Sequence, residues 1–180
     1  MKKLVATAIV ATGLVLPTTT RGGPAEVAEV LSQLIINTRA VIAENFTKPN
    51  KVWWLPDPLY RHILTTNEVL PAAVAGKAFH PLNTSGVVSL KMVVEDPRND
   101  SNRPDPVERE LYQHVVHTGQ PAARLTPDAA YHARPIKSAE WCLRCHGEPK
   151  GAPDPNFPKY KKEGWRIGEV IGAAIARVRR

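Results

Sequence analysis

Apolar residues recur at helical spacing directly after the pair Gly22 and Gly23. The recurring positions are Val27, Val30, Leu31, Leu34, Val41 and Ile42. Such spacing places side chains on one face of a helix. Pro24 suits the first helical turn, where a backbone N–H donor is not needed. The pattern predicts a long amphipathic helix that begins at Pro24 and ends near Asn45.

The following residues indicate a connection and then a second helix. Residues 47–58 contain three prolines and the pair Trp53-Trp54, a composition typical of turns. We expect both tryptophans to pack in the core or at its rim, as large aromatic side chains usually do. A second helix is predicted over residues 58–79, with a break or kink at Pro71.

Residues 86–95 alternate between two faces instead of repeating at helical spacing. Val88, Leu90 and Met92 stand at every second position, and β-branched residues dominate the segment. This pattern predicts a strand. Residues 131–136 and 167–178 are also rich in branched and small apolar side chains, and they are predicted to be strands as well.

A further helix is predicted after the Pro-, Asn- and Asp-rich loop of residues 96–106. Asp105 can cap it, Pro106 can occupy its first position, and Glu108 can complete a capping box. We expect this helix to run to His117 and to stop at Gly119. Helices first, and then strands interrupted by a helix, indicate an α+β fold with an antiparallel sheet.

The N-terminal residues have the composition of an export signal. Met1-Lys2-Lys3 is basic and residues 4–16 carry no charge, as in a secretory signal. This apolar run is too short to span a bilayer comfortably. We therefore expect residues 1–23 to be a signal peptide or a short N-terminal anchor, residues 24–180 to form a single domain, and the protein to be periplasmic.

The chain is mildly basic. Its formal charge of +7 falls to +4 when Lys2, Lys3 and Arg21 leave with a signal. Positive charges gather toward the C-terminus, at Lys159, Lys161, Lys162, Arg166, Arg177, Arg179 and Arg180. They predict either a docking patch for an acidic redox partner or an ordinary solvated face. No nucleic-acid motif is present, and membrane association is expected only through the N-terminus.

Both cysteines of the chain lie in one motif, Cys142-Leu143-Arg144-Cys145-His146. In Cys-x-x-Cys-His, each thiol can bond one vinyl group of a haem, and the histidine then lies beside the iron. A thioredoxin-like pair would need a strand–helix context, and a zinc site would need a second pair of ligands. The motif predicts one covalent haem c, with Cys142 and Cys145 as anchors and His146 as the proximal iron ligand.

The motif leaves the sixth iron position open. Candidate ligands are Met92, His62, His80, His114, His117 and His132. An iron without a sixth protein ligand is the alternative. Met92 stands on the apolar face of its predicted strand, which favours core packing. His114 shares a helix face with Leu111, as a core histidine would, and we expect His80 to lie exposed in a loop.

Two further expectations concern how a haem would be held. Arg98, Arg134 and Arg144 can pair with propionates because guanidinium groups bind carboxylates well, although ordinary surface exposure is the slightly favoured alternative. The chain has only three Phe residues. We therefore expect a buried haem to supply much of the apolar core.

Several short motifs occur in one order along the chain. They are Pro97-Arg98-Asn99, Pro104-Asp105 with Glu108, Ala133-Arg134-Pro135-Ile136, the Cys motif with Gly147, and Gly172-Ala173-Ala174-Ile175. From about residue 26 to 178 the chain resembles the Tll0287-like haem family, also described as DUF3365. The resemblance implies a PAS-like α+β fold that holds a single haem c and serves in many relatives as a sensing module. The chain has no third cysteine for the distal thiolate that some relatives use.

Two functions compete on these grounds. An electron carrier in the periplasm is preferred, because the sequence shows no output domain. The alternative is a haem-based redox or gas sensor module that works with a separate signalling partner. An enzyme is less favoured, since a haem peroxidase would need a distal acid–base pair and no residue pair makes that case.

Overall fold

The computed structural model describes residues 22–46, 71–155 and 158–180. Several expectations lie outside these residues: the export signal, the connection with Trp53 and Trp54, His62, and the first part of the second predicted helix. No helix in the described part of the chain is both long and apolar enough to cross a membrane.

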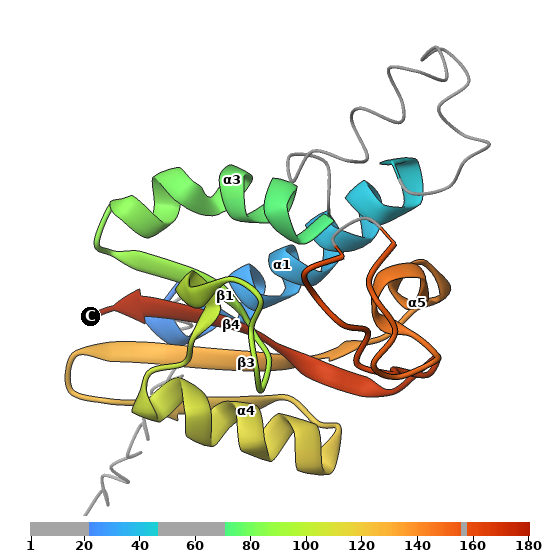
Figure 1. Ribbon diagram of the computed structural model, residues 1–180. Helices are drawn as coiled ribbons and strands as arrows, with labels where there is room; N and C mark the ends of the chain where they lie inside the picture. The colour runs from blue at the N-terminus through green and yellow to red at the C-terminus, as the bar shows by residue number, and fades with distance from the viewer. Residues whose placement is uncertain (1–21, 47–70, 156–157) are drawn as a thin grey trace, which may run out of the picture.

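A four-stranded antiparallel sheet forms the centre of the molecule. Its strands are β1 (Val88–Val93), β2 (Ala122–Leu125), β3 (Ala129–Lys137) and β4 (Val170–Arg179). They lie in the order β1-β4-β3-β2, so the last strand of the chain pairs with both β1 and β3 (Figure 1). This central position explains the apolar run of β4, because residues 171–176 are buried on both faces of the sheet.

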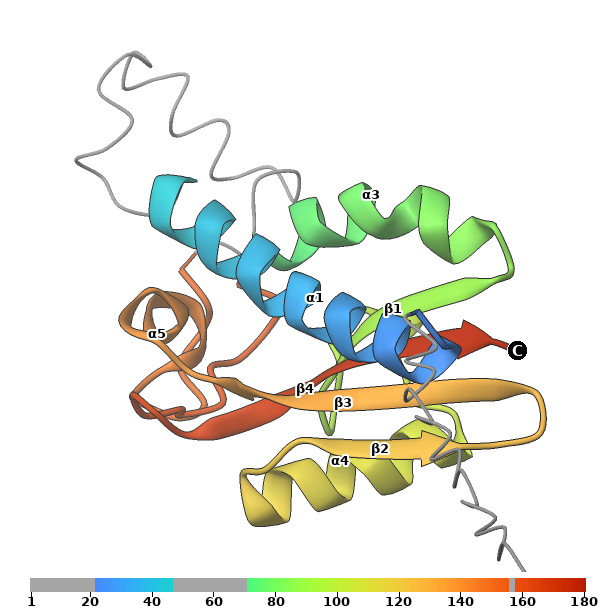
Figure 2. The same cartoon turned by 180° about the vertical axis from the view of Figure 1, so that it is seen from behind.

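Helices cover both faces of the sheet. They are α1 (Pro24–Phe46), α3 (Pro71–Thr84), α4 (Pro106–Thr118) and the short α5 (Glu140–His146), with a 3-10 turn at Asp100–Asn102. Helices α1 and α3 pack on one face and α4 packs on the other (Figures 1 and 2). Helix α5, which carries the Cys motif, lies beyond one end of the strands.

The predicted fold class is confirmed, and several boundaries are corrected. Helix α3 continues past Phe79 to Thr84, with Pro81 inside it. The final strand begins at Val170, and Ile167 is 68% exposed before it. Strand β2 was not predicted. Three of its four residues are exposed, so it lacks the apolar alternation that marks a half-buried strand.

The buried face of α1 differs from the predicted one. The large apolar residues Val30 and Val41 are exposed, whereas Ala28 and Ile35 are buried. Small residues bring a helix close to the sheet beneath it, and α1 packs against the sheet through a stripe that contains Ala28 and the fully buried Ser32. Helix α1 is therefore present as predicted. Ile42 is buried and Leu31 packs against the core as expected, but the most deeply buried positions are Ala28, Ser32 and Ile35.

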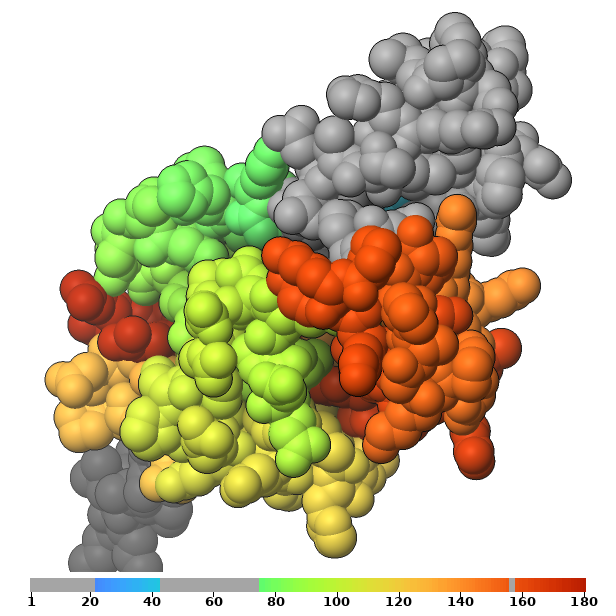
Figure 3. Space-filling model, in the orientation of Figure 1, coloured from blue at the N-terminus to red at the C-terminus, as the bar shows by residue number. Residues whose placement is uncertain are grey.

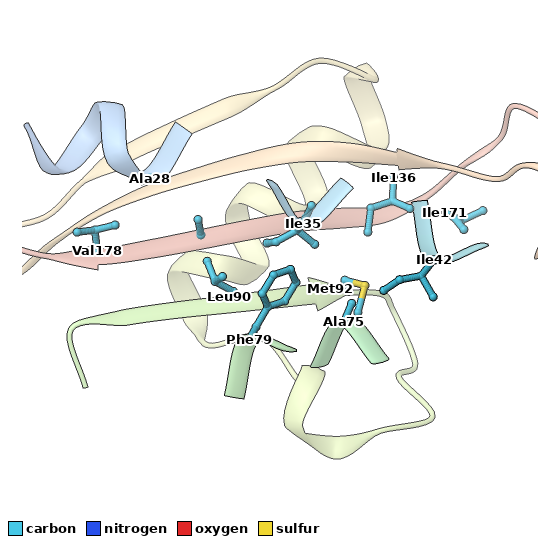
Figure 4. Packing of buried hydrophobic residues seen from close by; sticks show 12 residues of the cluster. Ala28, Ile35, Ile42, Ala75, Phe79, Leu90, Met92, Ile136, Ile171 and Val178 are labelled. Carbon is cyan, nitrogen blue, oxygen red and sulfur yellow. The ribbon is translucent and has the colours of Figure 1, made fainter. Parts of the chain in front are cut away.

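Within the residues that the structure describes, the buried apolar side chains form two clusters, one on each face of the sheet. The cluster under α1 and α3 includes Ile35, Phe79, Leu90 and Met92 (Figure 4). The cluster under α4 includes Val115 and the inward residues of β3 and β4. Neither cluster contains a residue of the Cys motif. Trp165, which follows the Cys motif in the chain, packs against the first cluster, so the expectation that a haem supplies part of the core stays a prediction.

The start of α4 has the predicted capping box. The backbone N–H of Glu108 donates to Oδ1 of Asp105 over 2.8 Å, and the backbone N–H of Asp105 donates to Oε2 of Glu108 over 2.9 Å. Lys91 of β1 adds an ion pair to the same carboxylate at 2.8 Å. Because Glu108 is only 2% exposed, this cation compensates a charge that would be costly to bury alone. Gly119 ends the helix in the left-handed conformation, as predicted.

The approach of β1 to β4 gives a stability prediction. A Cβ at Gly172 would lie 2.6 Å from the carbonyl oxygen of Val93 and 2.9 Å from Cγ1 of Val94. Gly172→Ala should therefore lower the free energy of unfolding by about 1–3 kcal/mol, measured by urea denaturation. Gly76→Ala is the control: apart from the backbone of its own helix and its chain neighbours, no atom lies within 4 Å of the added methyl, and alanine should stabilise α3 by up to about 1 kcal/mol. Equal stability of the two variants would contradict the close approach.

Candidate functional site

The Cys motif occupies a short helix held at its start by backbone contacts. Strand β3 leads to Ser138, whose N–H donates to the carbonyl of Glu169 over 2.8 Å and whose hydroxyl donates to the carbonyl of Arg166. These bonds tie the start of α5 to the segment before β4. One turn into the helix, Sγ of Cys142 accepts the N–H of Ala139 over 3.3 Å. Cys142 is consequently 3% exposed and has a fixed position.

The end of α5 is fixed by two glycines and one carbonyl. The helix stops at Gly147, where a Cβ would lie 2.6 Å from the carbonyl oxygen of Leu143. The chain later returns, and the N–H groups of Gly164 and Trp165 both donate to the carbonyl oxygen of His146 over 2.9 Å. Gly164 has φ of +82°, a conformation that favours glycine. The return therefore places residues 163–165 directly beside His146.

The imidazole of His146 is held on an edge and on a face. Its Nδ1 lies 2.7 Å from Oε2 of Glu163, and the ring of Trp165 stacks on it at 4.2 Å with an interplanar angle of 8°. A carboxylate only accepts hydrogen bonds, so Nδ1 carries the proton and donates it to Glu163. The other ring nitrogen, Nε2, is then the one with a lone pair suited to a metal ion.

Arg98 connects this carboxylate to the rest of the site. Its guanidinium lies 3.0 Å from Oε1 of Glu163 and 2.6 Å from Oδ2 of Asp154. The same group donates to the carbonyls of Cys145, over 3.3 Å, and Lys161, over 3.0 Å. Arg98 thereby joins the segment after β1 to the segment after α5, which lie against each other in Figure 3. Its predicted surface exposure is wrong, because the side chain is mostly buried among these partners.

The charges around Glu163 keep it ionised. Burial raises the pKa of Glu163, but the hydrogen bond from His146 and the guanidinium of Arg98 outweigh burial and lower it below its usual range. Asp154 is fully buried and pairs with the same guanidinium. The guanidinium of Arg98 therefore forms ion pairs with two carboxylates, those of Glu163 and Asp154.

Cys145 does not have the environment of a reactive, redox-active thiol. Burial, together with the charge of Asp154 and a hydrogen bond to it, raises the pKa of Cys145 to about 11. Catalytic dithiols need a lowered pKa, so this environment argues against a thioredoxin-like function. Within the described residues no group of three or more His, Cys, Asp and Glu side chains is arranged to hold a metal ion alone. The zinc alternative therefore gains no support there.

Arg39 of α1 reaches the first cysteine. Its Nη2 lies 3.9 Å from Sγ of Cys142, and its guanidinium lies 4.7 Å from the ring centroid of Trp141. Burial lowers the pKa of Arg39, and the charge of Cys142 and a hydrogen bond to it partly oppose that shift. The C-terminal half of α1 thus forms one wall beside the motif.

The candidate sixth ligands are dispersed over the fold. Met92 packs in the core, as predicted. His114 is exposed on α4, so the core position expected for it is wrong, and His117 is exposed in the last turn of the same helix. His80 is exposed as expected, but it stands within α3 and not in a loop.

Residues of β3 form polar contacts with α1 instead of facing the motif. His132 Nδ1 lies 2.8 Å from the hydroxyl of Ser32, and Arg134 pairs with Glu29 at 2.8 Å. Burial and the charge of Arg134 lower the pKa of His132, against the opposing effect of Glu29. Arg134 is therefore engaged by the chain itself. Arg144 of α5 is exposed, as expected.

The basic residues near the C-terminus form two separate groups. One follows α5 and contains Lys159, Lys161, Lys162 and Arg166. The other ends β4 and contains Arg177, Arg179 and Arg180. A ten-residue strand spans about 30 Å, and Figure 1 shows the C-terminus and α5 on opposite sides of the molecule. Only the first group lies near the motif.

Sequence reasoning did not identify the partners of His146. Glu163, Trp165, Asp154 and Arg39 carry no motif that separates them from ordinary surface residues. The one usable signal is Gly164 between Glu163 and Trp165, because a glycine there permits the turn that places its two neighbours around the imidazole.

Comparison with known proteins identifies the family and agrees with the fold. A family model described as Tll0287-like matches residues 21–179. Among solved structures, the crystal structure of the cyanobacterial heme-protein Tll0287 superimposes with a TM-score of 0.64 and 17% identity, over 88% of this chain and 98% of that chain. No curated protein matches the chain. Because the family model extends over nearly all of the described residues, the chain belongs to the Tll0287-like family.

Proposed function

We propose that this protein is an exported mono-haem c-type cytochrome that acts in periplasmic electron transfer. One haem is held covalently by Cys142 and Cys145, and His146 is its axial iron ligand. The observation that carries the proposal is the placement of all three residues on α5, with Nδ1 of His146 bound to Glu163 and Nε2 left for iron. The similarity to a heme-protein of the same family supports it.

The residues present fit such a group. The two thiols are not joined in a disulfide, and they are three residues apart on one helix, as two thioether bonds to adjacent vinyl groups require. When bound, the haem supplies an iron that accepts and releases one electron. The chain orients the imidazole through Glu163 and Trp165 and positions Cys142 through Ala139.

The proposal also assigns a surface to the redox partner and a segment to export. The exposed lysines at positions 159 and 161 stand in the loop that follows α5, and they give an acidic redox partner a contact close to the motif. The uncharged run of residues 4–16 directs the chain to the periplasm, where covalent haem attachment takes place.

A second candidate function is a haem-based redox or gas sensor module that works with a separate signalling partner. It is favoured by the placement of the candidate ligands in the described part of the chain. His80 and His114 are exposed on helices α3 and α4, and Met92 is enclosed in the core. This placement favours an open or easily displaced sixth position, which a gas sensor requires.

Loss of the cysteines should abolish haem attachment. The wild-type protein, produced in cells that mature c-type cytochromes, should retain haem colour on the polypeptide after denaturing gel electrophoresis. The Cys142→Ala, Cys145→Ala double variant should show no colour, because no thioether bond can form. An exposed change on the same helix, Arg144→Ala, is the control and should keep the stain. A wild-type polypeptide without stain would refute the covalent assignment.

Replacement of His146 should separate attachment from ligation. His146→Ala should keep the haem stain but shift the absorption spectrum toward weakly ligated, high-spin iron. His132→Ala is a matched control, because its partner Ser32 belongs to α1. If His146→Ala and His132→Ala both kept the wild-type ferrous spectrum, another residue would be the proximal ligand.

Carbon monoxide distinguishes the carrier from the sensor. A carrier with six-coordinate iron should show ferrous spectra that change little or slowly when carbon monoxide is added. Rapid formation of the carbon monoxide adduct in the reduced protein would instead identify an open sixth position and favour the sensor. The measurement is absorption spectroscopy of the oxidised and the reduced protein, each with and without carbon monoxide.

A further inference from the structure

A carboxylate is fixed directly behind the candidate iron ligand. Oε2 of Glu163 lies 2.7 Å from Nδ1 of His146 and 3.1 Å from Nη2 of Arg98, while Oε1 lies 3.0 Å from Nε of Arg98. Both carboxylate oxygens therefore have a donor. The stacked ring of Trp165 holds the imidazole against rotation away from this partner. Arg98 therefore holds the carboxylate and Trp165 holds the imidazole, so both partners of this contact have a fixed position.

Among the ionised groups in direct contact with Glu163 and Arg98, negative charge exceeds positive charge. Arg98 divides its single positive charge between Glu163 and the fully buried Asp154. Two carboxylates with one guanidinium leave one negative charge beside a neutral imidazole. A carboxylate that accepts the second ring N–H of a ligating histidine makes the histidine a more basic ligand.

We propose that Glu163 is a positioning residue that lowers the reduction potential of the haem through its negative charge, which its hydrogen bond to His146 transmits to the ligand. This inference rests on the proposed function, because it needs His146 to bind iron through Nε2. Reduction adds one electron and converts Fe(III) to Fe(II), while the Nδ1 proton stays between His146 and Glu163. A negative charge at Glu163 favours the more positive Fe(III), so reduction becomes less favourable.

Redox titration of the haem-loaded protein tests this inference. Glu163→Gln retains an oxygen that accepts from Nδ1 but removes the negative charge. At the midpoint potential of the wild type, the ratio of reduced to oxidised haem should rise at least tenfold in this variant. For a one-electron couple, that ratio corresponds to an increase of about 59 mV.

The matched control makes the same chemical change elsewhere on α5. Glu140 is exposed in the first turn of the helix, and Glu140→Gln should change the ratio less than threefold. Electron paramagnetic resonance of the ferric protein gives a second measurement. The g values should shift in Glu163→Gln and stay at wild-type values in Glu140→Gln, because only the first substitution alters the ligand field at the iron.

Two outcomes would overturn the inference. The first is a haem-loaded Glu163→Gln protein whose midpoint equals that of Glu140→Gln, and the second is a midpoint below the wild-type value. If Glu163→Gln does not accumulate, Glu163→Asp replaces it: the charge remains but the shorter side chain loses contact with Nδ1, so the midpoint should still rise. A wild-type midpoint in Glu163→Asp would then count against the inference. Wild-type protein without haem would instead overturn the proposed function itself.

Discussion

The surroundings of α5 depend on one guanidinium. Arg98 binds Asp154 at 2.6 Å and Glu163 at 3.0 Å, and it also donates to two backbone carbonyls. A carboxylate as completely buried as Asp154 costs several kcal/mol unless an opposite charge accompanies it. Without Arg98, Asp154 and Glu163 would remain as two like charges near the same thiol and imidazole. The position of Glu163 beside His146 is therefore determined by a residue that follows the edge strand β1.

Features fixed by neighbouring residues could be predicted from the sequence. The capping box of Asp105 and Glu108 and the helix stop at Gly119 involve residues within one turn of each other, so local chemistry decides them. The Cys motif is equally local, because its three functional residues lie on one helix. The alternation of apolar residues was also sufficient to predict strand β1, because one face of the strand must pack against the core.

Features decided by tertiary contacts could not be predicted in the same way. Helix α1 presents apolar residues on more than one side, and hydropathy alone favoured the larger Val30 and Val41 over Ala28. Ala28 and Ser32 lie against the sheet because small side chains permit the close approach of the helix. Similarly, His114 was expected in the core, yet Leu111 and Val115 already fill the face of α4 that meets the sheet, and the imidazole remains outside.

The separations along the chain between these partners imply an order of assembly. His146 and Glu163 are 17 residues apart, whereas Arg98 and Glu163 are 65 apart. Chain entropy makes the longer loop costlier to close by about 1 kcal/mol, and it closes more slowly. A folding chain would therefore bring the carboxylate to the imidazole before the guanidinium arrives from beyond β1. The helix with its two thiols would remain accessible from solvent during that interval, and the arrival of Arg98 would complete the enclosure.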